Sequence, residues 1–313
     1  MGNTVLEQNE IVEKILDLKE KKNAVLLAHY YQRGEIQDIA DYVGDSLELA
    51  KKAQETDADI IVFAGVKFMA ETAKILNPDK KVLHPNPESG CPMADMATME
   101  GVINLKKQHP DAAVVSYVNT NADVKTVSDV TVTSRNAVKV VKALKEDKII
   151  FVPDQFLGSF VAKQVPEKEF ILWKGFCPPH FNLSPEQLLP LKEQYPDAKI
   201  AVHPECNTET VKIADFVGST SQIIEYATTC DSENVIIGTE VGLKHMLEKV
   251  NPNKNYIFPV NADYCGTVHC CDMKKNTLDK ILEVLDKEIN EITLPEDVIE
   301  KAARPLKRML EIV

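Results

Sequence analysis

The sequence predicts an α/β protein made of three related αβα units, each with a short parallel sheet. Short apolar runs alternate with amphipathic helical patterns along the chain, as in proteins whose parallel strands are joined by crossover helices. One stretch of sequence also recurs three times. Residues 39–46 read IADYVGDS, residues 213–220 read IADFVGST, and residues 127–134 read VSDVTVTS.

Each copy carries an aspartate and a hydroxyl residue in the same register. The aspartates are Asp41, Asp129 and Asp215, and the hydroxyl residues are Ser46, Ser134 and Thr220. A polar residue ends an apolar run 17 residues before each hydroxyl, namely His29, Tyr117 and His203. Because this spacing is kept in all three copies, the chain is predicted to contain an internal repeat.

Each copy supplies three apolar runs that are expected to form strands. In chain order they are VLLAH (25–29), IIVFAG (60–65), KVLHP (81–85), VVSY (114–117), IIFVPD (149–154), EFILW (169–173), IAVH (200–203), VIIGTE (235–240) and NYIFP (255–259). Uninterrupted apolar runs are typical of parallel strands buried on both faces. A helical pattern follows each hydroxyl residue, so Ser46, Ser134 and Thr220 are candidate helix N-caps. As residues of a pocket they would also present free backbone N–H groups and a helix dipole to an anion, and this second role is favoured because all three follow the same strand-end register.

These signals divide the chain at about residues 95 and 184. The predicted units are 1–95, which includes an N-terminal helix, then 96–184 and 185–277, with C-terminal helices in 278–313. Packing of those helices on the first unit is one arrangement that the sequence leaves open. Ligands of parallel α/β proteins bind at the carboxyl ends of strands. Three units around a pseudo-threefold axis would therefore direct their strand ends into one central active site.

Composition and charge narrow the classes of function. Among the 313 residues, 36 are Lys or Arg and 48 are Asp or Glu, which gives a net charge of −12. Such an acidic surface disfavours a broad nucleic-acid or membrane-binding face. The sequence shows no targeting segment and no apolar run long enough to span a membrane, so a cytoplasmic protein is expected.

The seven cysteines point to thiol or metal chemistry rather than to a disulfide framework. One cysteine follows the third apolar run of each copy: Cys91, Cys177 and one of Cys265, Cys270 and Cys271. Three thiolates do not complete a tetrahedral structural zinc site. On a cubane iron–sulfur cluster they leave one iron open to act as a Lewis acid. Buried structural thiols are the alternative interpretation.

Several motifs in combination resemble those of the quinolinate synthase family, the A-type iron–sulfur enzymes of NAD biosynthesis. The matching stretches include LLAHYYQ (26–32), FAGVKFMAETAKIL (63–76), HPNPESGCPMADM (84–96), SYVNTNADVK (116–125), WKGFCPPH (173–180), HPECN (203–207) and IGTEVGLKHML (237–247). The resemblance implies three αβα domains around a central [4Fe–4S] cluster. It also implies condensation of iminoaspartate with dihydroxyacetone phosphate to quinolinate, phosphate and water.

The same resemblance implies roles for individual residues. Cys91, Cys177 and Cys270 become the cluster ligands, and Cys270 is preferred to Cys271 and Cys265 because of its spacing to Met273-Lys274-Lys275-Asn276. The implied substrate-binding residues are His29, Ser46, Tyr117, Asn119, Ser134, His203, Glu205 and Thr220. The implied catalytic residues are His29, Tyr31, Tyr117 and Glu205. His180 is expected in the second shell of the cluster.

Iminoaspartate is unstable in water, so an oxidase or dehydrogenase that produces it is expected as a functional partner. Two other functions stay open at this point. The first is a redox or iron sensor that uses the same three thiolates, and it would need a docking element for nucleic acid or protein. The second is a metal-independent sugar-phosphate lyase or aldolase that uses histidine and glutamate.

Overall fold

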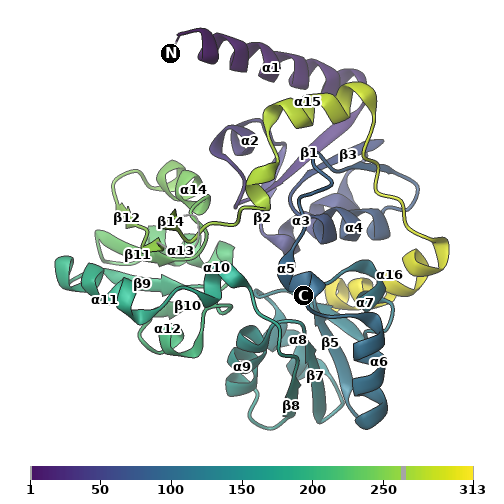
Figure 1. Ribbon diagram of the computed structural model, residues 1–313, viewed down its shortest axis with the longest axis vertical. Helices are drawn as coiled ribbons and strands as arrows, with labels where there is room; N and C mark the ends of the chain where they lie inside the picture. Colours follow the sequence, from purple (N-terminus) through teal and green to yellow (C-terminus); the bar gives the residue numbers. More distant parts are fainter. Residues whose placement is uncertain (1, 262–265, 313) are drawn as a thin grey trace.

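The computed structural model describes residues 2–261 and 266–312 and contains three four-stranded parallel sheets flanked by helices (Figure 1). The first, second and third units are defined here as these three sheets with their helices. The strand orders are β2-β1-β3-β4, β6-β5-β7-β8 and β10-β9-β11-β12, so the topology is the same each time. The predicted α/β class with three αβα units is confirmed.

The bounds of the elements follow the chain. The first unit contains α1 (Gly2–Lys21), β1 (Ala24–His29), α2 (Gly34–Ile39), β2 (Tyr42–Gly44), α3 (Ser46–Glu55), β3 (Ile60–Ala64), α4 (Lys67–Leu76) and β4 (Lys81–Leu83). Next come α5 (Pro92–Asp95), α6 (Met99–Gln108), β5 (Ala113–Tyr117), α7 (Ala122–Lys125), β6 (Val130–Val132), α8 (Ala137–Ala143), β7 (Lys148–Val152), α9 (Gln155–Gln164) and β8 (Glu169–Leu172).

The third unit and the C-terminal segment complete the chain. They comprise α10 (Pro178–Phe181), α11 (Pro185–Gln194), β9 (Lys199–Val202), α12 (Thr208–Lys212), β10 (Phe216–Val217), α13 (Thr220–Thr229), β11 (Asn234–Gly238), α14 (Leu243–Val250), β12 (Asn255–Ile257), β13 (Val260–Asn261), β14 (Gly266–Thr267), the 3₁₀ helix η1 (Met273–Lys275), α15 (Leu278–Lys287) and α16 (Glu296–Ile312).

The central strands are buried on both faces, as their apolar runs predict. Along β1, Val25 and Leu27 pack into the cluster that contains α3 and α4, whereas Leu26 and Ala28 pack into the cluster that contains α1 and α15. Successive side chains of a strand point to opposite faces. Helices therefore cover both sides of the first sheet, which makes it the middle layer of an αβα sandwich.

The three repeated aspartates have a structural role. The carboxylates of Asp41, Asp129 and Asp215 accept the backbone N–H of a central-strand residue at 2.7, 2.7 and 2.9 Å. Each aspartate comes just before a short edge strand, β2, β6 or β10. The repeated motif thus fixes that edge strand beside the central strand. These edge strands, of three, three and two residues, were not predicted.

The expectation that the repeated hydroxyls are N-caps is wrong. Asp45 and Ser219 are the caps of α3 and α13, each in a reciprocal capping box, so Ser46 and Thr220 are the first helical residues. Ser134 lies before α8, whose N-cap is Asn136. Because the preceding residue satisfies the free N–H groups of α3 and α13, the side chains of Ser46 and Thr220 are available for other contacts.

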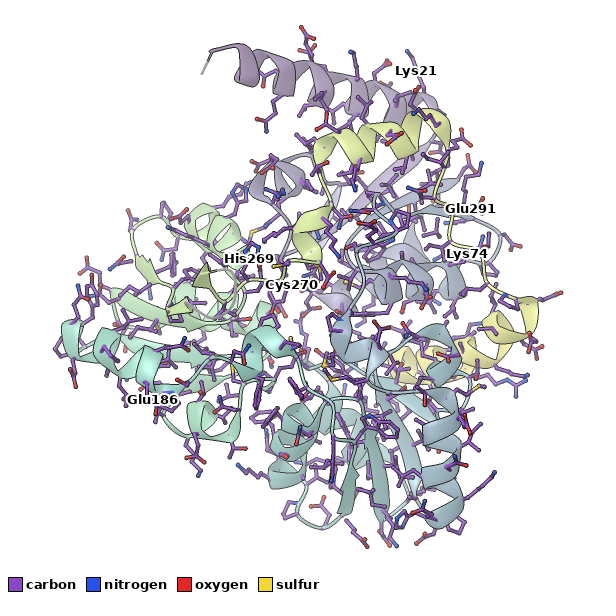
Figure 2. The ribbon with its side chains drawn as sticks, in the orientation of Figure 1. Lys21, Lys74, Glu186, His269, Cys270 and Glu291 are labelled. Atoms are coloured by element: carbon purple, nitrogen blue, oxygen red, sulfur yellow. The ribbon has the colours of Figure 1, made fainter. Side chains whose placement is uncertain are left out.

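The two C-terminal helices pack on different units. α15 lies along α1 of the first unit, and α16 packs against β6 and α7 of the second unit and α4 of the first (Figure 1). The segment between them is tied to the first unit by Lys74 and Glu291, whose Nζ and Oε1 atoms are 3.4 Å apart (Figure 2). Among the described residues, no helix is both long and apolar enough to cross a membrane.

Candidate active site

One cavity lies where the three units meet. Its lining includes every residue for which a substrate-binding or catalytic role is predicted: His29, Tyr31, Ser46, Tyr117, Asn119, Ser134, His203, Glu205 and Thr220. The structure brings these residues together, and their individual roles stay predictions.

The repeat explains why these side chains converge. His29 and Tyr117 are the last residues of β1 and β5, and His203 directly follows β9. These strands are the equivalent central strands of the three sheets. Because the carboxyl ends of parallel strands meet at one edge of a sheet, each unit offers the same edge to the common centre.

His29 and His203 are neutral hydrogen-bond donors rather than cations. Burial lowers the pKa of His29 to about 3 and that of His203 to about 4. Each Nδ1 lies within hydrogen-bond distance of the backbone N–H two residues later, Tyr31 at 3.1 Å and Glu205 at 3.3 Å. In a neutral ring the proton then resides on Nε2. The Nε2 of His203 lies 3.2 Å from Ser134 Oγ.

Glu205 is the buried carboxylate at the centre of the polar network. It accepts a hydrogen bond from the Tyr117 hydroxyl at 2.7 Å. Its other oxygen lies 2.9 Å from Nδ1 of His180. Burial alone would raise the pKa of Glu205, but the neighbouring His203 and His180 rings and the Tyr117 hydroxyl hold that pKa well below its usual range. Burial beside this carboxylate in turn raises the pKa of Tyr117.

Three free thiols meet at the same cavity. Cys91 and Cys177 are the N-cap residues of α5 and α10. Cys270, which is labelled in Figure 2, precedes η1. Each sulfur accepts the backbone N–H of the residue three positions later, which are Ala94, His180 and Met273. Burial raises the pKa of each thiol, that of Cys270 to about 12. A bound metal would therefore displace a proton from each sulfur.

The two other cysteines near Cys270 differ from it. Cys271 is disulfide-bonded, so its sulfur is not a thiolate donor in this state. Cys265 lies outside the described residues. Among the described cysteines of this segment, Cys270 is thus the free thiol that lines the cavity.

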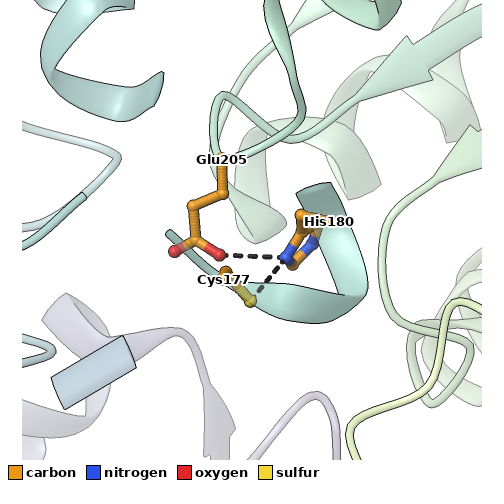
Figure 3. A group of neighbouring side chains, drawn as sticks. All are labelled: Cys177, His180 and Glu205. Carbon is orange, nitrogen blue, oxygen red and sulfur yellow. Dashed lines mark hydrogen bonds and ion pairs between the residues drawn. The ribbon is translucent and has the colours of Figure 1, made fainter. Parts of the chain in front are cut away.

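Cys177, His180 and Glu205 form a second possible donor set (Figure 3). Their ligand atoms all lie within 4.8 Å of one another, and His180 Nδ1 is 3.2 Å from Cys177 Sγ. Sulfur, imidazole nitrogen and carboxylate oxygen are ligands that transition metals accept. The residues around Cys177 can therefore hold a metal, either alone or as part of a larger thiolate site.

Two acidic residues of the cavity were missed from the sequence. Asp45 lines the cavity beside Ser46 and accepts the Ser221 hydroxyl at 2.6 Å. Glu240 accepts the backbone N–H of Cys270 at 3.2 Å and pairs with Lys274 at 3.1 Å. Asp45 lies in the motif IADYVGDS (39–46) and Glu240 lies in the motif IGTEVGLKHML (237–247), and both follow a strand. Their position after a strand is the sequence signal that could have identified them as residues of the site.

Comparison with known proteins agrees with this geometry. The family model described as "Quinolinate synthetase A protein" matches residues 13–311. A protein named quinolinate synthase from Sulfurihydrogenibium sp. (strain YO3AOP1) is 77% identical over 98% of this chain and 100% of its own length. Proteins of the same name from Aquifex aeolicus and Alkaliphilus metalliredigens are 64% and 50% identical over 98% of this chain, and over 95% and 100% of their own lengths. The chain therefore belongs to the quinolinate synthetase A family of enzymes.

Proposed function

We propose that this enzyme condenses iminoaspartate with dihydroxyacetone phosphate to form quinolinate, phosphate and two waters. The observation that carries the proposal is the convergence of three free thiols and a buried Tyr–Glu–His network on one cavity between three units. The family and its named relatives support the same reaction class.

We propose Cys91, Cys177 and Cys270 as ligands of a [4Fe–4S] cluster. The donor set fits this group because three convergent thiols are present, each with a backbone N–H directed at its sulfur. Hydrogen bonds to cluster sulfurs are a common means of tuning such centres. When bound, the cluster would supply Lewis-acid assistance for the loss of water through the iron that has no protein ligand.

The protein groups suit two anionic substrates although the chain is acidic. Ser46 and Thr220 are the first residues of α3 and α13, where the helix dipole favours negative charge. His29 and His203 each direct an N–H group without adding a fixed charge. Asn119 Oδ1 has no hydrogen-bond partner among the described residues, so it is available to accept from a substrate N–H or O–H group.

The proton-transfer groups follow from the same contacts. Glu205 is ionised and accepts a hydrogen bond from Tyr117, so it is suited to take up a proton from a substrate carbon. Tyr31 and Tyr117 keep their protons because burial raises both pKa values well above the usual range. They are therefore suited to donate hydrogen bonds or protons to oxygens that leave as water.

The supply of one substrate is part of the proposal. An imine hydrolyses readily in water, so an oxidase or dehydrogenase that releases iminoaspartate must act in the same compartment, which we propose to be the cytoplasm. No surface for direct docking is required by this chemistry.

The test uses protein purified without oxygen. We expect about four irons and four sulfides per chain, quinolinate formation from the two substrates, and loss of the iron with Cys270→Ala. Quinolinate formation by a protein without iron would contradict the cluster and favour a metal-independent enzyme. One metal per chain without inorganic sulfide, lost with Glu205→Gln, would instead place a single ion on Cys177, His180 and Glu205.

A further inference from the structure

Carboxylates line the cavity although the proposed substrates are anions. Four acidic residues are among the lining residues: Asp45, Glu205, Glu240 and Asp272. In the described part of the chain, no lysine or arginine lines the cavity. Like charges repel each other, and the repulsion is stronger where water is excluded. A cavity of this kind takes up anions only if cations outside its lining offset the charge of the carboxylates.

Two of the four carboxylates have a lysine partner from the segment of η1. Lys274 Nζ lies 3.1 Å from Glu240 Oε1, and Lys275 Nζ lies 2.7 Å from Asp272 Oδ1. Glu205 is the proposed proton acceptor, so its charge belongs to the reaction itself. The fourth carboxylate stands in another part of the cavity, at the start of α3, and it needs a different cation.

Arg135 is the cation at the start of α3. It directly follows Ser134, a lining residue, but does not line the cavity itself. Its Nη1 lies 2.7 Å from Glu48 Oε1 and 4.0 Å from Asp45 Oδ2. The same Asp45 oxygen accepts the Ser221 hydroxyl of the third unit at 2.6 Å. A guanidinium of the second unit thus stands directly beside a carboxylate of the first unit that faces the cavity.

The repeat shows that the fold does not require a cation at this position. The equivalent residues of the first and third units are Leu47 and Ser221, which carry no charge. The side chains of Arg135 and Glu48 are 40% and 36% exposed, and ion pairs with such exposure contribute little to stability. A positive charge that neither the helix nor the folded state needs points to a role in the site.

We propose that Arg135 governs the uptake of anionic substrates, because its guanidinium offsets the charge of Asp45 and Glu48 beside the cavity. The ligand class is a molecule with a phosphate or carboxylate group. The dipoles of α3 and α13 favour such a group at their first residues, but the carboxylate that caps α3 opposes this effect until a cation balances it. The inference deepens the proposed function and rests on it for the identity of the anions.

Two variants of the same ion pair separate this role from a structural one. Arg135→Gln removes the cation, whereas Glu48→Gln removes a carboxylate that shares it. Gln222 stands at the position equivalent to Glu48 and completes the capping box of α13, so glutamine is suited to the same contact in α3. If the pair only held two units together, both variants would change the enzyme in the same direction. Charge compensation predicts opposite directions.

The first measurement is steady-state formation of quinolinate by protein purified without oxygen, at varied concentrations of dihydroxyacetone phosphate. Arg135→Gln should raise KM about 3–10-fold, Glu48→Gln should lower KM about threefold, and kcat should stay close to that of wild type. Both changes in KM should shrink in 1 M KCl, where the Debye length is about 3 Å. Arg304→Gln is the control, because Arg304 pairs with Glu300 on the exposed face of α16. Its KM should equal that of wild type.

The second measurement is independent of turnover. Calorimetric titration of the same preparations with inorganic phosphate gives a dissociation constant for an anion. Phosphate is expected to bind most weakly to Arg135→Gln, more tightly to wild type, and most tightly to Glu48→Gln. Arg304→Gln should bind phosphate as wild type does.

Several results would overturn the inference. They are a change of KM in the same direction in Arg135→Gln and Glu48→Gln, an unaltered phosphate affinity in Arg135→Gln, and a wild type that binds no phosphate. Failure of the proposed function is distinguishable from these results. Wild type would then form no quinolinate, while the order of the phosphate affinities would still report on Arg135.

Discussion

Lys125 offers a quantitative test of how the site loops are held. Its side chain is fully buried, and its Nζ donates to the backbone carbonyls of Val118, at 2.9 Å, and Thr120. These carbonyls lie on either side of Asn119, a residue of the cavity. Burial lowers the pKa of Lys125 from 10.5 to about 8.

The first unit contains a natural control. Gln37 stands 88 residues before Lys125 and donates to the carbonyls of Tyr30 and Gln32 at 3.0 and 2.9 Å. These are the equivalent carbonyls of the first unit. A neutral amide thus makes the same contacts there, so Lys125→Gln is expected to keep the contacts of the loop and to remove the ionisable group.

The sign of the pH effect follows from the direction of the pKa change. Between pH 8 and 10.5 the unfolded chain binds the Lys125 proton more tightly than the folded chain, so stability rises with pH. A pKa of about 8 instead of 10.5 corresponds to a gain of about 3 kcal/mol across this range. The neutral amine formed at high pH still has hydrogens to donate to both carbonyls.

Urea unfolding at a series of pH values measures this gain. The free energy of unfolding of wild type, minus that of Lys125→Gln, should increase by about 3 kcal/mol from pH 8 to pH 10.5. Other groups that titrate in this range are common to both proteins and cancel. A difference that stays constant with pH would refute the reasoning, because it would mean that burial does not disfavour the charged lysine.

Three further predictions concern the cavity, the cluster segment and the C-terminal helix. Glu205→Gln should lower kcat by about 10²–10⁴-fold without unfolding, and a wild-type rate of quinolinate formation would exclude Glu205 as the base. Glu240→Gln should make iron loss to a chelator about tenfold faster, since Glu240 holds the backbone of Cys270; an unaltered rate would contradict this. Leu306→Ala, in the buried face of α16, should lower the free energy of unfolding by about 2–5 kcal/mol. The exposed Leu189→Ala should have little effect, and similar losses in urea would contradict the packing of α16.

The repeat made much of the cavity predictable. His29, Tyr117 and His203 occupy one register, and equivalent positions of similar units around a common centre must face that centre. The N-cap prediction failed because Asp45 and Ser219, one residue earlier, cap more effectively with their reciprocal partners. A pattern of residue types gives the start of a helix only to within a residue or two.

Contacts between units could not be predicted in the same way. The hydroxyl oxygens of Tyr31 and Thr239 lie 2.8 Å apart, but the two residues are 208 positions apart in the sequence. No motif near either residue indicates this contact. The short edge strands were missed for a different reason. A strand of two or three residues has no hydrophobic periodicity, and its position depends on the hydrogen bonds of Asp41 and its equivalents.

The cavity is asymmetric because equivalent positions of the three units carry different residues. Three identical units would form a symmetric cavity, which could not distinguish the two ends of an unsymmetrical substrate. Here the strand-end residue is a histidine in the first and third units and a tyrosine in the second. Glu205 receives hydrogen bonds from Tyr117 of the second unit and from His180, whereas His29 faces the cavity with no comparable carboxylate partner in the described part of the chain. The carboxylate that accepts from Tyr117 therefore stands on one side of the cavity. For the proposed condensation and dehydration, this asymmetry would distinguish the two ends of a bound substrate.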